Sequence, residues 1–344
     1  MYTHSAMLNT NTTITYNSTR PFICATILVG AQSEPFLPAC LESVAEAVDY
    51  AVVDLNGNYE ENAKVLESSR LYKEKRMRIE KSVFKDYSTA RNNTFAMLPP
   101  ETEWIMRLDA DEVHFPQDLQ ILIREIIPHL DDSIGMLDAY WLCFFHSFKY
   151  VTKLERRHDL FIRYHKGMKW ERSIHEQLIG RQGKRLAAPY IFHHYANIKD
   201  PEEFLQKVNA YIKLTAQESS LNKMLAKDPM LELMKDKEGR KEGRKEALEI
   251  MRARFLQEQD KIFLYNGQHP EVNIDWLDPN KAPDFIKLMQ EELDAILEGK
   301  AKPQHGGKRR ILFRLPSLLF HLKTWYAKKQ ALHLAATQLK KSLP

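Results

Sequence analysis

Two aspartates, Asp109 and Asp111, carry the clearest chemistry in this sequence, because they directly follow a short apolar run at residues 104–108. That run has the composition of a buried strand in an α/β sheet, and such sheets bind ligands at the carboxyl ends of their strands. Acids two residues apart project to the same side while strand geometry continues. Their oxygens suit Mg²⁺ or Mn²⁺, which also carries phosphate oxygens. A solvated acidic turn is the competing interpretation of the pair taken alone.

Alternating strands and helices precede this motif and must position it. The expected elements fall, in chain order, at residues 22–30 (strand), 34–47 (helix), 50–55 (strand), 60–75 (helix), 76–80 (strand), 87–98 (helix) and 104–108 (strand). Such alternation predicts parallel strands joined by right-handed crossovers. The first part of the chain is therefore expected to form a nucleotide-binding α/β half-domain. The sequence has neither a Gly-x-Gly-x-x-Gly motif nor a Walker loop, so a dinucleotide-binding domain and a P-loop enzyme are not supported.

The remaining chain changes from aromatic to helical character. Residues 134–150 predict a strand pair or strand and loop lining a cleft, and residues 159–163 and 190–193 predict short strands. Helices are expected at 201–219, 231–263 and 283–297, followed by a linker at 299–307. We therefore divide the chain into a flexible leader (1–20), a catalytic domain (21–215), a helical extension (216–300) and a basic amphipathic C-terminal helix (301–344).

Composition places the chain among soluble globular proteins, with 344 residues, 44% hydrophobic and 28% charged. Cys24, Cys40 and Cys143 show no Cys-x-x-Cys spacing, and buried thiols fit a reducing cytosol. The N-terminus lacks the layout of a signal peptide, and no apolar stretch is long enough to span a bilayer. We expect a cytoplasmic protein.

The C-terminal segment is basic and amphipathic. Residues 308–341 hold nine Lys or Arg and no acid, interleaved with apolar and aromatic residues. This pattern predicts a helix that lies on the inner face of the cell membrane. Packing against the catalytic domain, or against a second copy in a homo-oligomer, is the competing interpretation. Nucleic-acid binding is not expected, because the apolar content is high for a surface that tracks phosphates.

Several blocks of the sequence resemble glycosyltransferase family 2 enzymes with a GT-A fold. The similar blocks are residues 27–44, 52–54, 84–92, 108–112 (LDADE, like the family's metal motif) and 174–176 (IHE). Two turns depart from the family pattern, at Gln32-Ser33-Glu34 and after Asp54. The resemblance implies an α/β fold of the GT-A nucleotide-diphospho-sugar transferase type, with a mostly parallel central sheet flanked by helices and a helical C-terminal extension.

The resemblance also assigns roles at the donor site. Asp54 would read the base of the sugar nucleotide by accepting a hydrogen bond from a ring N–H, and Glu34 would line the same pocket. The competing role for such an acid is a turn carboxylate that bonds its own backbone. Arg91 would bind a phosphate bidentately, unless it forms a structural ion pair with Asp86.

The metal ligands follow from the LDADE block. Asp111 is the first candidate for a direct ligand, and Asp109 is expected to bridge the ribose hydroxyls and the metal. His194 would complete the metal shell or touch the diphosphate, because His194-Tyr195 aligns with the family's His-Tyr pair. Glu112 binds the acceptor or caps the next helix.

The general base is expected in the last block, residues 174–176. An inverting transfer needs one carboxylate near the acceptor hydroxyl, and Glu176 is the best candidate, with Glu171 and Asp159 as alternatives. His175, beside it, would steady the acceptor or a phosphate, or serve as a structural histidine.

The sequence thus predicts a metal-dependent inverting glycosyltransferase of the hexosyltransferase type. It would use Mn²⁺ or Mg²⁺ to move a sugar from a nucleotide-sugar donor, UDP-linked before GDP- or dTDP-linked. The acceptor would be a glycan or lipid-linked molecule in envelope polysaccharide or lipopolysaccharide assembly. One competing function is a nucleotidyltransferase of related α/β build, which would need a glycine-rich loop where residues 30–33 read GAQS. The other is a catalytically silent membrane-associated scaffold, which would tolerate the loss of Asp111.

Overall fold

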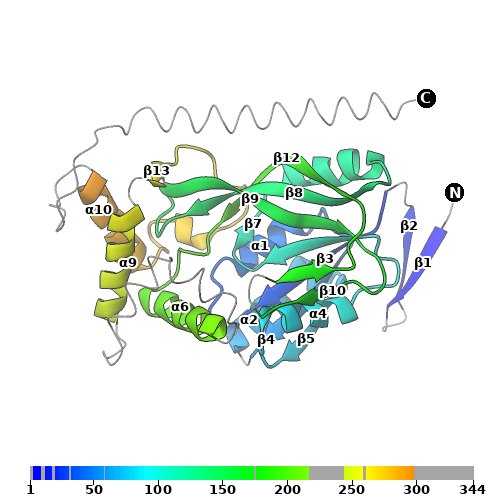
Figure 1. The fold of residues 1–344 in the computed structure, drawn as a ribbon, viewed down its shortest axis with the longest axis horizontal. Helices are drawn as coiled ribbons and strands as arrows, with labels where there is room; N and C mark the ends of the chain where they lie inside the picture. The colour runs from blue at the N-terminus through cyan, green and yellow to red at the C-terminus, as the bar shows by residue number, and fades with distance from the viewer. Residues whose placement is uncertain are drawn as a thin grey trace.

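The structure, a computed structural model, describes residues 3–8, 12–17, 20–30, 32–57, 59–173, 176–216, 244–258 and 261–297. Figure 1 shows a central sheet with helices packed around it, and helices α6, α9 and α10 gathered at one end. The predicted basic tail at 301–344 lies outside the described residues. Among the residues that are described, no helix is both long and apolar enough to cross a membrane.

The first half of the sheet is parallel, as the alternating pattern predicted. Its strands lie in the order β5-β4-β3-β6 and pair in parallel throughout. The strands are β3 (Ile23–Val29), β4 (Tyr50–Asn56), β5 (Met77–Ser82) and β6 (Trp104–Asp109). The crossover helices are α1 (Leu37–Val44), α2 (Glu60–Ser68), α3 (Arg70–Lys73) and α4 (Tyr87–Ala96). The single helix expected at 60–75 is two helices, because Ser69 is extended (φ −65°, ψ 155°) and caps α3.

The second half of the sheet is mixed, which corrects the prediction of a mostly parallel sheet. The order continues β6-β9-β8-β12-β7, and β9 is antiparallel to both of its neighbours. The reason is the connection: only residues 145–149 join β8 to β9, and so short a link permits only a hairpin. The strands are β7 (Glu112–Val113), β8 (Ile134–Phe144), β9 (Tyr150–Arg163) and β12 (Lys184–His194). Strands β9 and β12 contain, and extend well beyond, the short strands predicted at 159–163 and 190–193.

Smaller elements complete the domain. A helical segment, α5 (Pro116–Ile121), η1 (Leu122–Ile126) and η2 (Ile127–His129), follows β7. Strands β10 (Lys169–Glu171) and β11 (Gln177–Ile179) form a separate hairpin. At the N-terminus, β1 (Thr3–Leu8) and β2 (Thr12–Asn17) pair as another two-stranded sheet. The expected flexible leader therefore contains a hairpin.

The C-terminal elements pack on the central sheet. They are α6 (Pro201–Ala216), α9 (Arg244–Glu258), β13 (Phe263–Leu264), η4 (Asp275–Leu277) and α10 (Asp284–Leu297). Strand β13 pairs with β9, and Phe285 and Ile286 of α10 share a buried cluster with Phe36 and Phe144. Part of the predicted helical extension (216–300) therefore helps to form the core next to β8 and β9.

Candidate functional site

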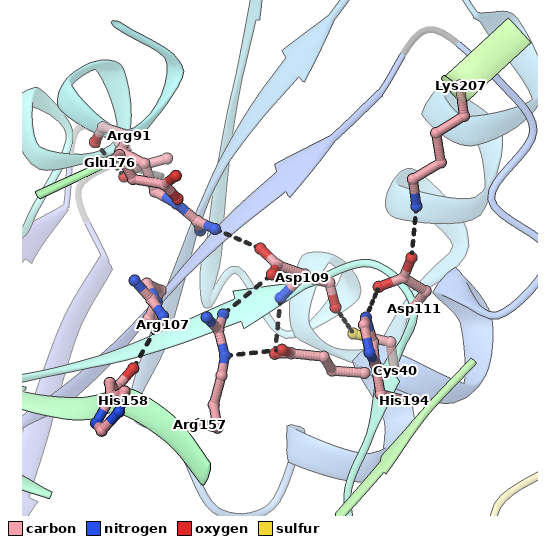
Figure 2. Close-up of polar contacts among 12 residues, drawn as sticks. Cys40, Arg91, Arg107, Asp109, Asp111, Arg157, His158, Glu176, His194 and Lys207 are labelled. Carbon is pink, nitrogen blue, oxygen red and sulfur yellow. Dashed lines mark hydrogen bonds and ion pairs between the residues drawn. The ribbon is translucent and has the colours of Figure 1, made fainter. Parts of the chain in front are cut away.

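The two aspartates at the end of β6 have different partners, because the strand ends at Asp109 and residues 110–111 turn before β7. The condition for both carboxylates to lie on one side, a strand that continues through Asp111, is therefore not met. Figure 2 shows three arginines and Glu176 on one side of Asp109, and Asp111, His194 and Lys207 on the other. The site thus has two parts that meet at Asp109.

Asp109 is the counter-ion of two buried arginines. Its Oδ1 lies 2.5 Å from Nη2 of Arg91, and its Oδ2 lies 3.0 Å from Nη2 of Arg157. Burial alone would raise the pKa of Asp109, but Arg91 and Arg157 lower it well below its usual range. Asp109 is therefore ionised at any physiological pH.

Arg91 is fixed by the helix that carries it. Helix α4 begins at Tyr87 and is capped by Asp86, whose Oδ1 accepts a hydrogen bond from the Thr89 backbone N–H at 2.7 Å. Asp86 is thus a helix cap, and the competing structural pair between Arg91 and Asp86 does not form. Instead the Arg91 Nε lies 3.3 Å from Oε1 of Glu176. Arg91 therefore joins Asp109 to the candidate base.

Asp111 forms the second part of the site. Its Oδ1 lies 3.3 Å from Nε2 of His194, and its Oδ2 lies 3.3 Å from Nζ of Lys207. The pairing of β7 with β12 sets this geometry, because His194 is opposite Glu112 and the Tyr195 backbone N–H donates to the Asp111 carbonyl at 2.9 Å. Against the effect of burial, Lys207 and His194 lower the pKa of Asp111, and Asp111 raises the pKa of His194.

The structure separates the two adjacent histidines. His194 faces Asp111 and stacks on Trp141, with ring centroids 4.4 Å apart. His193 is fully buried, and the Tyr195 hydroxyl lies 2.9 Å from its Nδ1. His194 is therefore the histidine in the site, and His193 belongs to the core.

Asp111 and His194 supply a carboxylate and an imidazole for a divalent cation. Within the part of the chain that the structure describes, no group of three or more His, Cys, Asp and Glu side chains is arranged to hold a metal ion. Asp109, the third predicted ligand, is bound by arginines. A pair of protein ligands still fits Mg²⁺ or Mn²⁺ in a nucleotide site, because substrate phosphates and water complete the shell.

Glu176, the predicted base, pairs with the buried Arg91. Its side chain is 16% exposed, and although burial raises its pKa, Arg91 and Arg107 bring the pKa below the usual value. The alternatives are engaged elsewhere: Glu171 pairs with Lys169, and Asp159 pairs with Arg181 and Arg185. His175, the neighbour of Glu176 that we expected to steady the acceptor, lies outside the described residues.

The two predicted donor-site acids differ in their surroundings. Asp54 is buried at the end of β4, where its Oδ2 accepts from Asn93 at 3.2 Å while its Oδ1 has no partner. Burial raises the pKa of Asp54. Glu34 instead forms a 2.7 Å ion pair with the buried Lys199. Asp54 thus has one buried oxygen without a hydrogen-bond partner, whereas Glu34 is held by an ion pair.

Sequence reasoning missed several residues of the site. Glu112, predicted as an acceptor ligand or a cap, is fully buried, accepts from the Asp109 backbone N–H at 3.1 Å and lies 3.0 Å from Nε of Arg157. Arg107 and Arg157 were not predicted at all. Arg107 and Asp109 lie two residues apart on β6 and therefore on the same face, so strand periodicity could have identified Arg107. Burial and the nearby Arg157 and Arg91 lower the pKa of Arg107 to about 9.

Comparison with known proteins finds a family model that matches part of this chain. Residues 26–183 match the sequence model of glycosyl transferase family 2. No curated protein matches this chain.

Three solved structures are similar to parts of this chain. Rv0371c from Mycobacterium tuberculosis H37Rv is 14% identical, with 41% of this chain and 73% of that one covered and a TM-score of 0.25. The rv0371c homolog from mycobacterium sp. strain JC1 is 13% identical, with 48% and 85% covered and a TM-score of 0.27. S. aureus TarS 1–349 is 11% identical, with 82% and 93% covered and a TM-score of 0.32.

Proposed function

We infer that this GT-A-fold enzyme is a metal-dependent inverting transferase. The inference rests on the match of residues 26–183 to glycosyl transferase family 2. The enzyme takes a sugar from a nucleotide-sugar donor, UDP-linked in preference to GDP- or dTDP-linked. Its acceptor is a glycan or a lipid-linked molecule of envelope polysaccharide or lipopolysaccharide assembly.

The observation that supports this proposal most is the pairing of Asp111 with His194 and Lys207 at the carboxyl end of β6. Departure of a nucleoside diphosphate develops negative charge, which cations must stabilise. Lys207 and His194 bring positive charge to this point, and Arg91 lies on the other side of Asp109. The Lys207 side chain is 40% exposed, so it is free to move from Asp111 to a phosphate.

Asp111 and His194 are the residues that would hold a divalent cation. When bound, Mn²⁺ or Mg²⁺ would act as a Lewis acid that stabilises the leaving diphosphate. Lys207 contacts the carboxylate of Asp111, which the cation would also bind. In the absence of a cation, the ammonium group of Lys207 therefore balances the charge of Asp111. Asp109, held by its two arginines, orients the ribose side of the donor.

Asp54 is the proposed hydrogen-bond acceptor for a pyrimidine base of the donor nucleotide. A uracil or thymine ring carries an N–H donor, and the unpartnered Oδ1 of Asp54 at the end of β4 is an acceptor for it. Asn93, which donates to the other oxygen at 3.2 Å, holds the carboxylate in place.

Glu176 is the proposed general base. It removes the proton from the acceptor hydroxyl as that oxygen attacks the sugar carbon and the diphosphate leaves from the opposite side. The 3.3 Å contact with Arg91 keeps the carboxylate ionised and oriented. The low pKa of Glu176 favours the form that accepts a proton.

The C-terminal segment, residues 308–341, is proposed to bring the enzyme to its acceptor. The basic and aromatic pattern of its sequence suits the surface of an anionic membrane, where lipid-linked acceptors reside. This proposal makes the enzyme cytoplasmic and peripheral to the membrane; self-association through the same segment is the alternative.

The first test is the thermal stability of the purified enzyme with UDP-, GDP- and dTDP-sugars, each with and without Mn²⁺. A rise in melting temperature that requires both Mn²⁺ and one nucleotide family is expected. The matched control is Asp111→Asn, which should lose the Mn²⁺-dependent part of the rise. No stabilisation by any donor, with or without metal, would contradict the proposed function.

A further inference from the structure

Arg107 is a buried arginine without an acidic partner. Its side chain lies on β6, only 8% of the residue is exposed, and its one hydrogen bond runs from Nη2 to the carbonyl oxygen of His158 at 2.9 Å. Its Nε is buried and has no acceptor. Among the described side chains, no carboxylate forms an ion pair with it. A guanidinium has five N–H donors and a fixed charge, so most of its bonding capacity is unused.

The nearby carboxylates already serve other arginines. Arg91 forms ion pairs with Asp109 and Glu176. Arg157 forms ion pairs with Asp109 and Glu112. Figure 2 shows Arg107 on the same side of Asp109 as Arg91 and Glu176. Three guanidiniums thus lie together, and the third has no anion of its own.

Two further donors next to Arg107 also lack acceptors. The guanidinium of Arg107 lies over the indole of Trp170, 5.2 Å from the ring centroid. The Trp170 Nε1 and the Arg91 Nη1 are both buried without a hydrogen-bond partner. Buried donors are nearly always paired in folded proteins, and each exception calls for an explanation. The unmet groups of Arg107, Trp170 and Arg91 are all N–H donors, so these three side chains lack an acceptor, and an anionic acceptor suits them best.

We propose that Arg107 binds an anionic group, a carboxylate or a phosphate, carried by the substrate that reacts beside Glu176. The proposal rests on the proposed glycosyltransferase function and adds the substrate class. The anion would lie on the transferred sugar, as the carboxylate of a uronic acid, or on the acceptor, as a phosphate or carboxylate. The planar fork of arginine matches both anions through two parallel hydrogen bonds. The contact of the Arg107 guanidinium with the Trp170 ring, 5.2 Å from the ring centroid, helps to hold the fork in place before the substrate arrives.

The nucleotide diphosphate itself is assigned to the other part of the site. Asp111, His194 and Lys207 lie on the opposite side of Asp109 from Arg107 (Figure 2). The diphosphate is therefore the anion that Lys207 binds, and a second anion, on the sugar or the acceptor, is the one that Arg107 binds. The enzyme is expected to discriminate against a neutral sugar at the position that Arg107 contacts.

The test uses the full-length protein and isothermal titration calorimetry with paired probes. The donor arm compares UDP-glucuronic acid with UDP-glucose. The acceptor arm compares glucose 6-phosphate with glucose in the presence of saturating UDP and Mn²⁺. Each pair is measured on the wild type, Arg107→Met, Arg107→Lys and the control Arg78→Met, which removes an exposed arginine of β5 that pairs with Glu80.

The wild type and Arg78→Met should bind the charged member of one pair at least tenfold more tightly than the neutral member. The arm in which this occurs identifies the source of the anion. Arg107→Met should lose the preference while its affinity for UDP and its melting temperature stay near those of the wild type. Arg107→Lys, which keeps the charge without the fork, should retain only part of the preference.

Two results would overturn the proposal: no preference in either arm for the wild type, or a preference that survives in Arg107→Met. A large fall in the melting temperature of both Arg107 variants, with UDP binding lost, would assign Arg107 a structural role and overturn it as well. UDP binding by the wild type reports separately on the proposed function, because failure there removes the donor site and not only the anion preference.

Discussion

Asp109→Asn and Asp111→Asn should separate structural from ligand-binding acids within one motif. Asp109 is the counter-ion of Arg91 and Arg157, whose side chains are 3% and 9% exposed. Removing one partner of a buried ion pair costs about 3–5 kcal/mol. Because the Asp109 side chain is 31% exposed, solvent screens part of the interaction, and we expect about 2–3 kcal/mol of lost stability.

Asp111→Asn should destabilise the protein much less. One partner, Lys207, is 40% exposed, and the other, His194, can release its proton when the carboxylate is absent. We expect a loss of about 1 kcal/mol or less. In calorimetry at neutral pH, Asp109→Asn should melt roughly 3–6 °C below the wild type, with Asp111→Asn close to the wild type. Mn²⁺-dependent nucleotide binding should be lost in Asp111→Asn.

The pH dependence of this difference has a definite sign. The folded-state pKa of Asp109 is lowered below its unfolded value, so its stabilising effect is present above that unfolded pKa, about 3.9, and fades as the pH falls. The gap in melting temperature between the wild type and Asp109→Asn should therefore be full at neutral pH and narrow below about pH 4. A variant that melts within 1 °C of the wild type at neutral pH would refute the reasoning.

Three other changes test the rest of the site. Glu176→Gln should abolish transfer but keep nucleotide binding by calorimetry; loss of both would show that the base is misplaced. Lys207→Met should raise the KM for the donor about tenfold, in line with a charged hydrogen bond of about 1.5–3 kcal/mol. The same variant should bind Mn²⁺ more tightly without nucleotide, because Lys207 no longer occupies Asp111; unchanged Mn²⁺ affinity would contradict this competition. Deletion of residues 308–344 should release the protein from anionic liposomes in a sedimentation assay, and unchanged sedimentation would favour packing on protein.

The parallel half of the fold could be predicted because its strands are apolar on both faces. Strands β3 and β4 are buried along almost their whole length, so each appears in the sequence as an uninterrupted apolar run. The antiparallel half gave no such signal. The turn from β8 to β9 has His146 at φ 52° instead of the Gly or Asn that marks most hairpins, so the hairpin between the two long strands was not recognised.

The site could be predicted where its residues are close in sequence or lie in a known block. Asp109, Asp111, Arg91 and Glu176 all come from such blocks, and the structure brings Arg91, Asp109 and Glu176 into contact. Lys207 could not be found this way. It reaches Asp111 from 96 residues further along the chain, beyond the residues that match the family, and only the docking of α6 brings it there.

The turn at residues 110–111 explains why one short motif serves two parts of the site. If β6 continued through Asp111, both carboxylates would face the same partners and would compete for the same cations. Because the strand stops at Asp109, that carboxylate balances Arg91 and Arg157, while Asp111 is left to His194 and Lys207. The separation keeps the arginines from neutralising Asp111, so that its charge remains available to a metal ion. It also leaves Arg107 without a carboxylate, which is the condition under which a substrate anion can bind there.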